Sequence, residues 1–146
     1  MIADLDRFCG TLAREAPDAV VYADAKGVIG FWNKGAERIF GFSEAEALGK
    51  TLDIIIPENL RARHWTGYWA SMQSGKTRYG AGDLLAVPAL RKDGTRISVE
   101  FTVMLFHDEH GAVSGIAAIL RDVTQRFEEM KRLRQAAAAR KKDASG

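Results

Sequence analysis

A single histidine within a predicted helix is the residue of this chain best suited to bind a ligand. His64 lies in the run 59–69, among arginines and aromatic residues and between predicted strands. An imidazole on a short helix beside apolar side chains is a setting in which proteins supply an axial ligand to haem iron. The alternative is that His64 caps or packs its helix, with its ring paired to a backbone carbonyl. The sequence therefore raises the hypothesis of a haem site with His64 as the metal ligand.

Other reactive arrangements are missing from the sequence. His107 and His110 flank a predicted turn, with no third ligand at a metal-binding spacing. The single cysteine, Cys9, excludes an internal disulfide framework and a cysteine-based zinc cluster. There is no glycine-rich phosphate loop, nucleophile elbow or kinase signature, and no carboxylate pair suited to acid–base work. We therefore predict that the chain is not an enzyme.

Composition and charge place the chain among ordinary globular proteins. It has 146 residues, of which 47% are hydrophobic and 27% charged. The net charge of +2 is too small to predict binding to nucleic acid. Residues 121–146 hold eight basic and four acidic residues, which is typical of a solvated helix. With no apolar run of about 18 residues and no signal-peptide pattern at the start, we expect no membrane span and a cytoplasmic location.

Hydrophobic periodicity and turn residues predict the order of the elements. Residues 2–15 read as an amphipathic helix that Pro17 ends, and Gly27 closes a β-hairpin turn. Further helices are predicted at 34–40, 43–48, 57–74 and about 122–139. The predicted strands are 19–24, 28–33, about 78–90, 96–106 and 113–120. This order gives an α+β fold, in which five antiparallel strands carry short helices on one face and leave space for a ligand between the layers.

Several motifs then resemble a known family, the PAS domain of bacterial signalling proteins. The matching segments are 31–42, 46–50, 91–95 and 121–126. The resemblance implies a sensory domain over residues 17–121, preceded by a flanking helix at 1–16 and followed by a signalling helix and basic tail at 122–146. It also implies that the junction around Asp122 and Thr124 carries events in the pocket to the last helix.

The run 54–64, followed by Tyr68, is similar to the haem-binding PAS sensors of oxygen. The resemblance implies b-type haem held by His64, with a diatomic gas or the redox state as the signal. The implied pocket has an apolar wall and an arginine for the haem propionates. Its residues are Arg61, His64, Tyr68, Leu84, Leu85, Phe101, Val103 and Ile119. Gly82, Leu84 and Leu85 depart from the methionine and arginine that two classes of haem PAS sensor carry there. Arg63 and Arg78 are further candidates for the propionates.

Two other interpretations of the pocket stay open. One is a PAS module without a cofactor that serves dimerisation or protein interaction, or that senses a small apolar ligand. The other is a non-covalent flavin beside Trp32 and Asn33, because Cys9 lies outside the PAS core and a LOV-type cysteine adduct is excluded. The apolar stripes of both terminal helices predict a homodimer. No output domain is recognised in this sequence, so we expect either an output partner, whose identity the sequence leaves open, or a larger protein of which this chain is a part.

Overall fold

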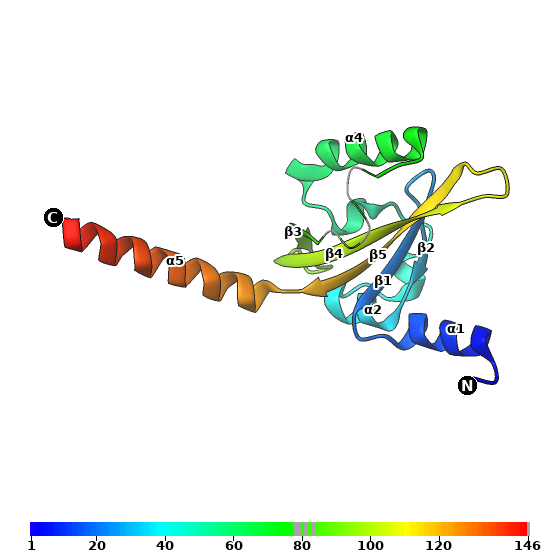
Figure 1. Ribbon diagram of the computed structural model, residues 1–146, viewed down its shortest axis with the longest axis horizontal. Coiled ribbons are helices and arrows are strands. Elements are labelled where there is room, and N and C mark those ends of the chain that lie inside the picture. Colours follow the sequence, from blue (N-terminus) through cyan, green and yellow to red (C-terminus); the bar gives the residue numbers. More distant parts are fainter. Residues whose placement is uncertain (78–79, 81, 83, 146) are drawn as a thin grey trace.

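A five-stranded antiparallel sheet forms the centre of the fold, with the strand order β2-β1-β5-β4-β3. The strands are β1 (Ala19–Asp24), β2 (Ile29–Trp32), β3 (Leu85–Leu90), β4 (Arg96–His107) and β5 (Val113–Asp122). The computed structural model describes residues 1–77, 80, 82 and 84–145. The two terminal segments of the PAS-like region, β1 and β5, therefore lie side by side in the middle of the sheet (Figure 1).

Helices connect the two halves of the sheet and flank it at both ends of the chain (Figure 1). They are α1 (Leu5–Glu15), α2 (Lys34–Phe40), α3 (Glu44–Ala47), the 3-10 helix η1 (Leu52–Ile55), α4 (Glu58–Ser74) and α5 (Thr124–Ser145). The predicted α+β plan, a five-stranded antiparallel sheet with short helices on one face, is confirmed.

The hydrophobic core lies between one face of the sheet and the short helices. Its largest fully buried side chains are Trp32, Phe40, Ile29 and Val99. Alternation along the strands explains this packing, because residues two apart point to the same face of a sheet. The opposite face carries partly exposed apolar side chains such as Met104 and Phe106, which are 48% and 44% exposed.

Local capping signals in the sequence start two of the helices. The Asn33 side chain accepts from the backbone N–H of Ala36 at the start of α2. Ser43 and Glu46 form the predicted capping box at α3, in which each side chain accepts from the other residue's backbone N–H. These contacts are local in sequence, which is why the sequence predicts them.

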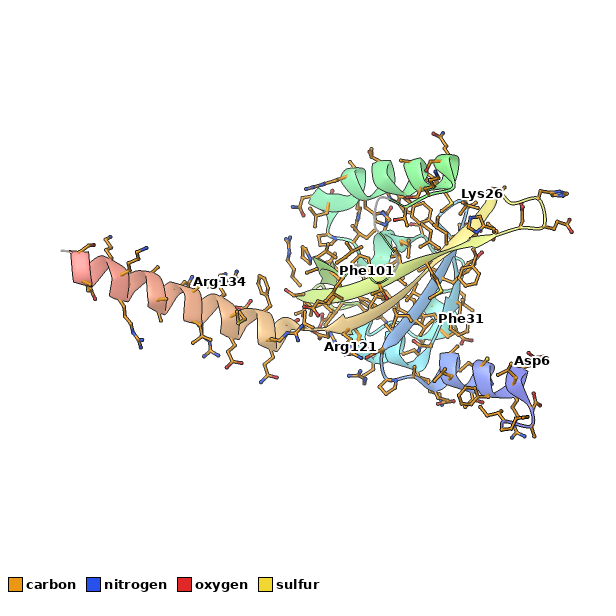
Figure 2. The ribbon with its side chains drawn as sticks, viewed as in Figure 1. Asp6, Lys26, Phe31, Phe101, Arg121 and Arg134 are labelled. Atoms are coloured by element: carbon orange, nitrogen blue, oxygen red, sulfur yellow. The ribbon has the colours of Figure 1, made fainter. Side chains whose placement is uncertain are left out.

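The two terminal helices are amphipathic or polar and bury none of their side chains. The C-terminal end of α1 is tied to α2 by an ion pair between Glu15 and Lys34, 2.8 Å apart. Helix α5 extends away from the sheet, and exposed side chains such as Arg134 project from it (Figure 2). Both helices thus offer surface to a partner.

The element boundaries differ most from the prediction at α5, η1 and β3. Helix α5 reaches Ser145 rather than about 139, and η1 was not expected. The strand predicted from about 78 is observed as β3 from Leu85, while positions 78, 79, 81 and 83 lie outside the described residues. Within the described ranges, no helix combines the length and the apolar character needed to cross a membrane.

Candidate functional site

Helix α4 presents His64 on the side of the helix that docks on the sheet. Pro57 precedes the helix and Gly75, at φ 69°, ends it. Arg61, His64 and Tyr68 recur at intervals of three and four residues, so they share one face of the helix. Tyr68 is the only residue of α4 that is fully buried. The helix is therefore held by few contacts, and these lie on the His64 side.

The His64 imidazole is half-buried among aromatic rings. Its ring centroid lies 4.7 Å from that of Trp65, edge to face, and 5.7 Å from that of Tyr68. The Nδ1 atom is buried and has no hydrogen-bond partner. Burial lowers the pKa of His64 below its ordinary value, against the opposing attraction of the Asp53 carboxylate. The ring is thus neutral near pH 7, the form in which imidazole binds metal ions.

Tyr68 anchors α4 to the end of β1. Its hydroxyl donates to the backbone carbonyl of Asp24 at 2.6 Å and lies 3.3 Å from that of Ala23. Burial raises the pKa of the Tyr68 phenol, which keeps the hydroxyl protonated as a donor. Tyr68 is therefore one of the side chains that attach α4 to the rest of the domain.

Arg61 is partly engaged by its own protein. Its Nε donates to the Ile56 carbonyl at 3.0 Å and lies 4.0 Å from Oδ1 of Asp53. The two terminal nitrogens of its guanidinium are the part suited to a carboxylate partner. Arg63 is exposed on the same helix, and Arg78 lies outside the described residues.

Three of the predicted wall residues share one face of the sheet. Leu85 on β3 pairs directly with Phe101 on β4, and Val103 follows on the same face of β4. Phe101 packs against the hydrophobic core, yet all three side chains are only partly buried. This helix-covered face therefore keeps a set of apolar side chains that the protein itself does not fully enclose.

Two of the predicted wall residues, Ile119 and Leu84, lie away from this face. Ile119 pairs with Thr102, so it lies on the opposite face from Phe101 and is 38% exposed. The cause is a register shift between Phe106 and His107, which moves the pairing of β4 with β5 by one residue and reverses the faces. Leu84 precedes β3 and is 63% exposed.

The two residues suggested for flavin contact are used by the fold. Trp32 is fully buried and donates from Nε1 to the Phe42 carbonyl at 2.9 Å. The Asn33 side chain is 3% exposed and makes hydrogen bonds through both its oxygen and its nitrogen. Neither side chain has a free polar group to offer a flavin ring, so this basis for a flavin site is not supported.

The donor chemistry at His64 fits a haem better than a bare metal ion. Among the described residues, no three His, Cys, Asp or Glu side chains are grouped to hold a metal ion. His64 instead offers one neutral imidazole whose Nδ1 has no protein partner, and the helix-covered sheet face offers apolar side chains. A single imidazole with apolar surroundings is the ligand set of a five-coordinate haem.

The junction between β5 and α5 is held by contacts to β4. Thr124 accepts at its hydroxyl from the Ser98 N–H at 3.0 Å, and the Val123 N–H donates to the Ser98 carbonyl at 2.9 Å. The Asp122 carboxylate accepts from the Thr124 N–H at 2.9 Å, as the predicted cap requires. Arg126 on α5 pairs with Glu100 on β4. The sequence indicated Asp122 and Thr124, but not Ser98 or Glu100.

Comparison with known proteins identifies the family. A family model for the PAS fold matches residues 14–128. The PAS domain of a protein from Colwellia psychrerythraea superposes with a TM-score of 0.71 at 22% identity, covering 84% of this chain and 99% of that one. The chain belongs to the PAS family, and it is a PAS sensory domain of signal transduction.

Two relatives extend the comparison beyond the fold. The sensor protein FixL of Bradyrhizobium diazoefficiens is 29% identical over 119 residues, which cover 82% of this chain and 23% of FixL. The oxygen sensor protein DosP of Escherichia coli is 29% identical over 105 residues, which cover 72% of this chain and 13% of DosP. The chain thus spans less than a quarter of the length of either relative.

Proposed function

We propose that this PAS domain binds b-type haem through His64 and senses a diatomic gas or the redox state. The observation that carries the proposal is the half-buried, neutral His64 imidazole, whose Nδ1 has no partner within the protein. The run 54–64 with Tyr68, similar to haem-binding PAS sensors of oxygen, supports it. So does the likeness to DosP, which is named an oxygen sensor.

Each residue of the site has a role in this proposal. His64 supplies the iron ligand, and the free end of the Arg61 guanidinium pairs with a propionate. Leu85, Phe101 and Val103 contact the apolar faces of the macrocycle. Bound haem supplies an iron atom at which a diatomic gas or an electron is received. With the group bound, these apolar side chains would limit the access of water to it.

The signal leaves the domain through α5. Helix α5 begins directly after β5 and is held to β4 at Ser98 and Glu100, so a change in the packing of the sheet alters its orientation. The output partner is a protein or domain that contacts this helix.

A haemin titration with two histidine variants tests the haem site. Purified wild-type protein should take up one haemin per chain with a sharp Soret band. His64→Ala should lose this uptake, whereas His110→Ala, on an exposed turn, should keep it. Absence of a Soret band in the wild type, or equal uptake by His64→Ala, would overturn the proposal. The cofactor-free alternative would then remain.

The exposed stripe of α1 favours a second property, a homodimer. Leu5, Phe8 and Leu12 are 62%, 45% and 59% exposed on one side of the helix. An amphipathic helix of this length is marginal in water unless its apolar side is covered. We propose that a second copy covers it, with or without haem. Sedimentation should show a dimer that Phe8→Glu dissociates and that Arg7→Glu, off the stripe, retains. A monomeric wild type would overturn this.

A further inference from the structure

The residues that surround His64 also attach α4 to η1 and to the turn between β1 and β2. Trp65 donates from Nε1 to Oδ1 of Asp53 at 2.7 Å. Tyr68 donates to the Asp24 carbonyl, at the start of the turn between β1 and β2. The centroids of the two rings lie 5.2 Å apart, edge to face. We call Trp65 and Tyr68, with Asp53 and the turn 24–27, the aromatic clasp.

The indole of Trp65 lies directly on the backbone of Gly27. A Cβ built at Gly27 would come within 2.3 Å of two ring carbons of Trp65, a distance that no side chain tolerates. Gly27 also has φ +82°, so the turn conformation and the contact both favour glycine. The absence of a side chain at this position lets α4 approach the turn closely.

The rings of this clasp hold the His64 imidazole. It packs on the rings of Trp65 and Tyr68, while its Nδ1 makes no hydrogen bond. Ring packing on Trp65 and Tyr68 therefore orients the imidazole and leaves Nδ1 without a protein partner.

We infer that Trp65 is the positioning residue of the His64 site: through Asp53 and Gly27 it fixes the imidazole relative to the sheet and ties the movement of α4 to the β1–β2 turn. This inference rests on the proposed haem function for its role in sensing. The claim that Trp65 orients the His64 ring concerns the protein without haem, and it is tested by measurements on the haem-free protein.

Two pairs of variants separate the clasp from general packing of α4. Asp53→Asn keeps an oxygen that can accept from the Trp65 indole, whereas Asp53→Ala removes it. Trp65→Phe removes the indole N–H and the ring on Gly27. Trp69→Phe alters the neighbouring ring, which stacks on Trp65 at 5.2 Å but is 41% exposed. In each pair, one variant disturbs the clasp and the other is its control.

The first measurements use the protein without haemin. At a pH well above the pKa of histidine, where loss of the Asp53 charge leaves the ring neutral, NMR should show the same His64 ring-proton shifts in the wild type, Asp53→Asn and Trp69→Phe. Under the same conditions the shifts should be displaced in Asp53→Ala and Trp65→Phe. The amides of residues 26–28 should exchange roughly tenfold faster in the two displaced variants, with β4 and β5 still protected. If Trp65→Phe unfolds, the Asp53 pair gives the answer. Unchanged shifts and exchange in Asp53→Ala, or equal changes in both members of a pair, would overturn the inference.

Haemin then tests the link to the site. Asp53→Ala should bind haemin about tenfold more weakly than the wild type and show a displaced Soret band, and Asp53→Asn should restore both. Equal affinity and an equal spectrum in Asp53→Ala would overturn the positioning role. If haemin does not bind the wild type, the proposed function is wrong. The positioning role of Trp65 is then decided by the haem-free measurements alone.

Discussion

Arg126 and Glu100 form an ion pair that joins the first turn of α5 to β4, with 2.6 Å between Nη2 and Oε2. The Glu100 side chain is 23% exposed and that of Arg126 is 63% exposed. The contact therefore crosses from the sheet to the helix that we propose as the output.

The pair should contribute modestly to stability and more clearly to the attachment of α5. Arg126→Gln and Glu100→Gln should each lower the free energy of unfolding by up to about 1 kcal/mol, because solvent screens such pairs. The double variant should cost little more than either single variant. Urea denaturation of all four proteins gives the coupling energy. Strictly additive losses would show that the two side chains do not interact in solution.

Asn33 should be among the most sensitive positions of the domain, because its side chain joins three segments. Its hydrogen-bond partners are the N–H groups of Val20 and Ala36 and the carbonyls of Ala13, Ala16 and Asp18. Asn33→Ala removes a helix cap and leaves buried backbone groups unpaired, at a cost of about 2 to 4 kcal/mol. Asn59→Ala, on the exposed side of α4, is the control. A similar midpoint of urea unfolding for both variants would contradict this role.

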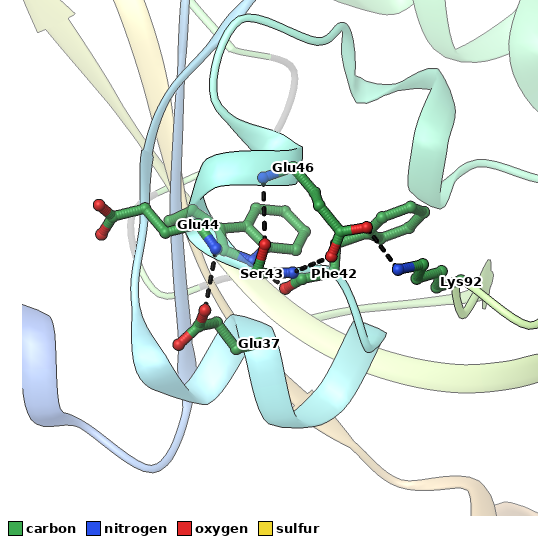
Figure 3. A network of polar contacts seen from close by, with 7 residues as sticks. Glu37, Phe42, Ser43, Glu44, Glu46 and Lys92 are labelled. Atoms are coloured by element: carbon green, nitrogen blue, oxygen red, sulfur yellow. Dashed lines mark hydrogen bonds and ion pairs between the residues drawn. The ribbon is translucent and has the colours of Figure 1, made fainter.

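The glutamate of the α3 capping box should make the domain less stable in acid. Lys92 and Ser43 donate hydrogen bonds to the Glu46 carboxylate (Figure 3) and lower its pKa from 4.5 to about 2. The pKa is lower in the folded chain than in the unfolded one. The stabilisation is therefore complete above pH 4.5 and is lost as the pH falls toward 2.

Glu46→Gln isolates this contribution. The variant should unfold at a lower urea concentration than the wild type at pH 7, and the difference should shrink as the pH falls from 5 toward 2, within the range set by the two pKa values. Glu44→Gln is the matched control, since the Glu44 carboxylate points away from Lys92 (Figure 3). A difference that stays constant with pH would assign the effect to packing instead of charge.

Local signals explain which parts of the fold the sequence predicts. Caps such as Asn33 and the glycine turns depend on residues within a few positions, and hydrophobic periodicity gives the element order. The face of Ile119 depends instead on the register shift beside His107, which no periodicity within β5 reveals. Continuing the pairing of His107 with Val113 without the shift would place Phe101 opposite Ile119.

The site shows the same division. His64 and Tyr68 stand out in the sequence because their spacing places them on one face of a helix. Asp53 and Gly27 do not, since their contacts with Trp65 join a turn, a 3-10 helix and α4. Sequence therefore indicates the candidate ligand, and only the tertiary structure shows what holds it.

Gly27 should be less tolerant of substitution than another glycine in a similar backbone conformation. Gly27 and Gly94 both lie in turns between strands, with φ +82° and +85°. A Cβ at Gly94 would meet nothing within 4 Å, whereas one at Gly27 would collide with the Trp65 indole. Gly94→Ala should therefore cost about 1 kcal/mol from backbone strain alone, and Gly27→Ala about 2 to 4 kcal/mol.

Urea unfolding of both alanine variants measures the difference, and a second substitution identifies its source. In a Trp65→Ala background the ring is gone, so Gly27→Ala should cost no more than Gly94→Ala does. An undiminished penalty in that background would show that the turn itself, and not the contact with α4, requires glycine. A penalty that disappears with the indole would establish that α4 docks through Trp65 on this turn.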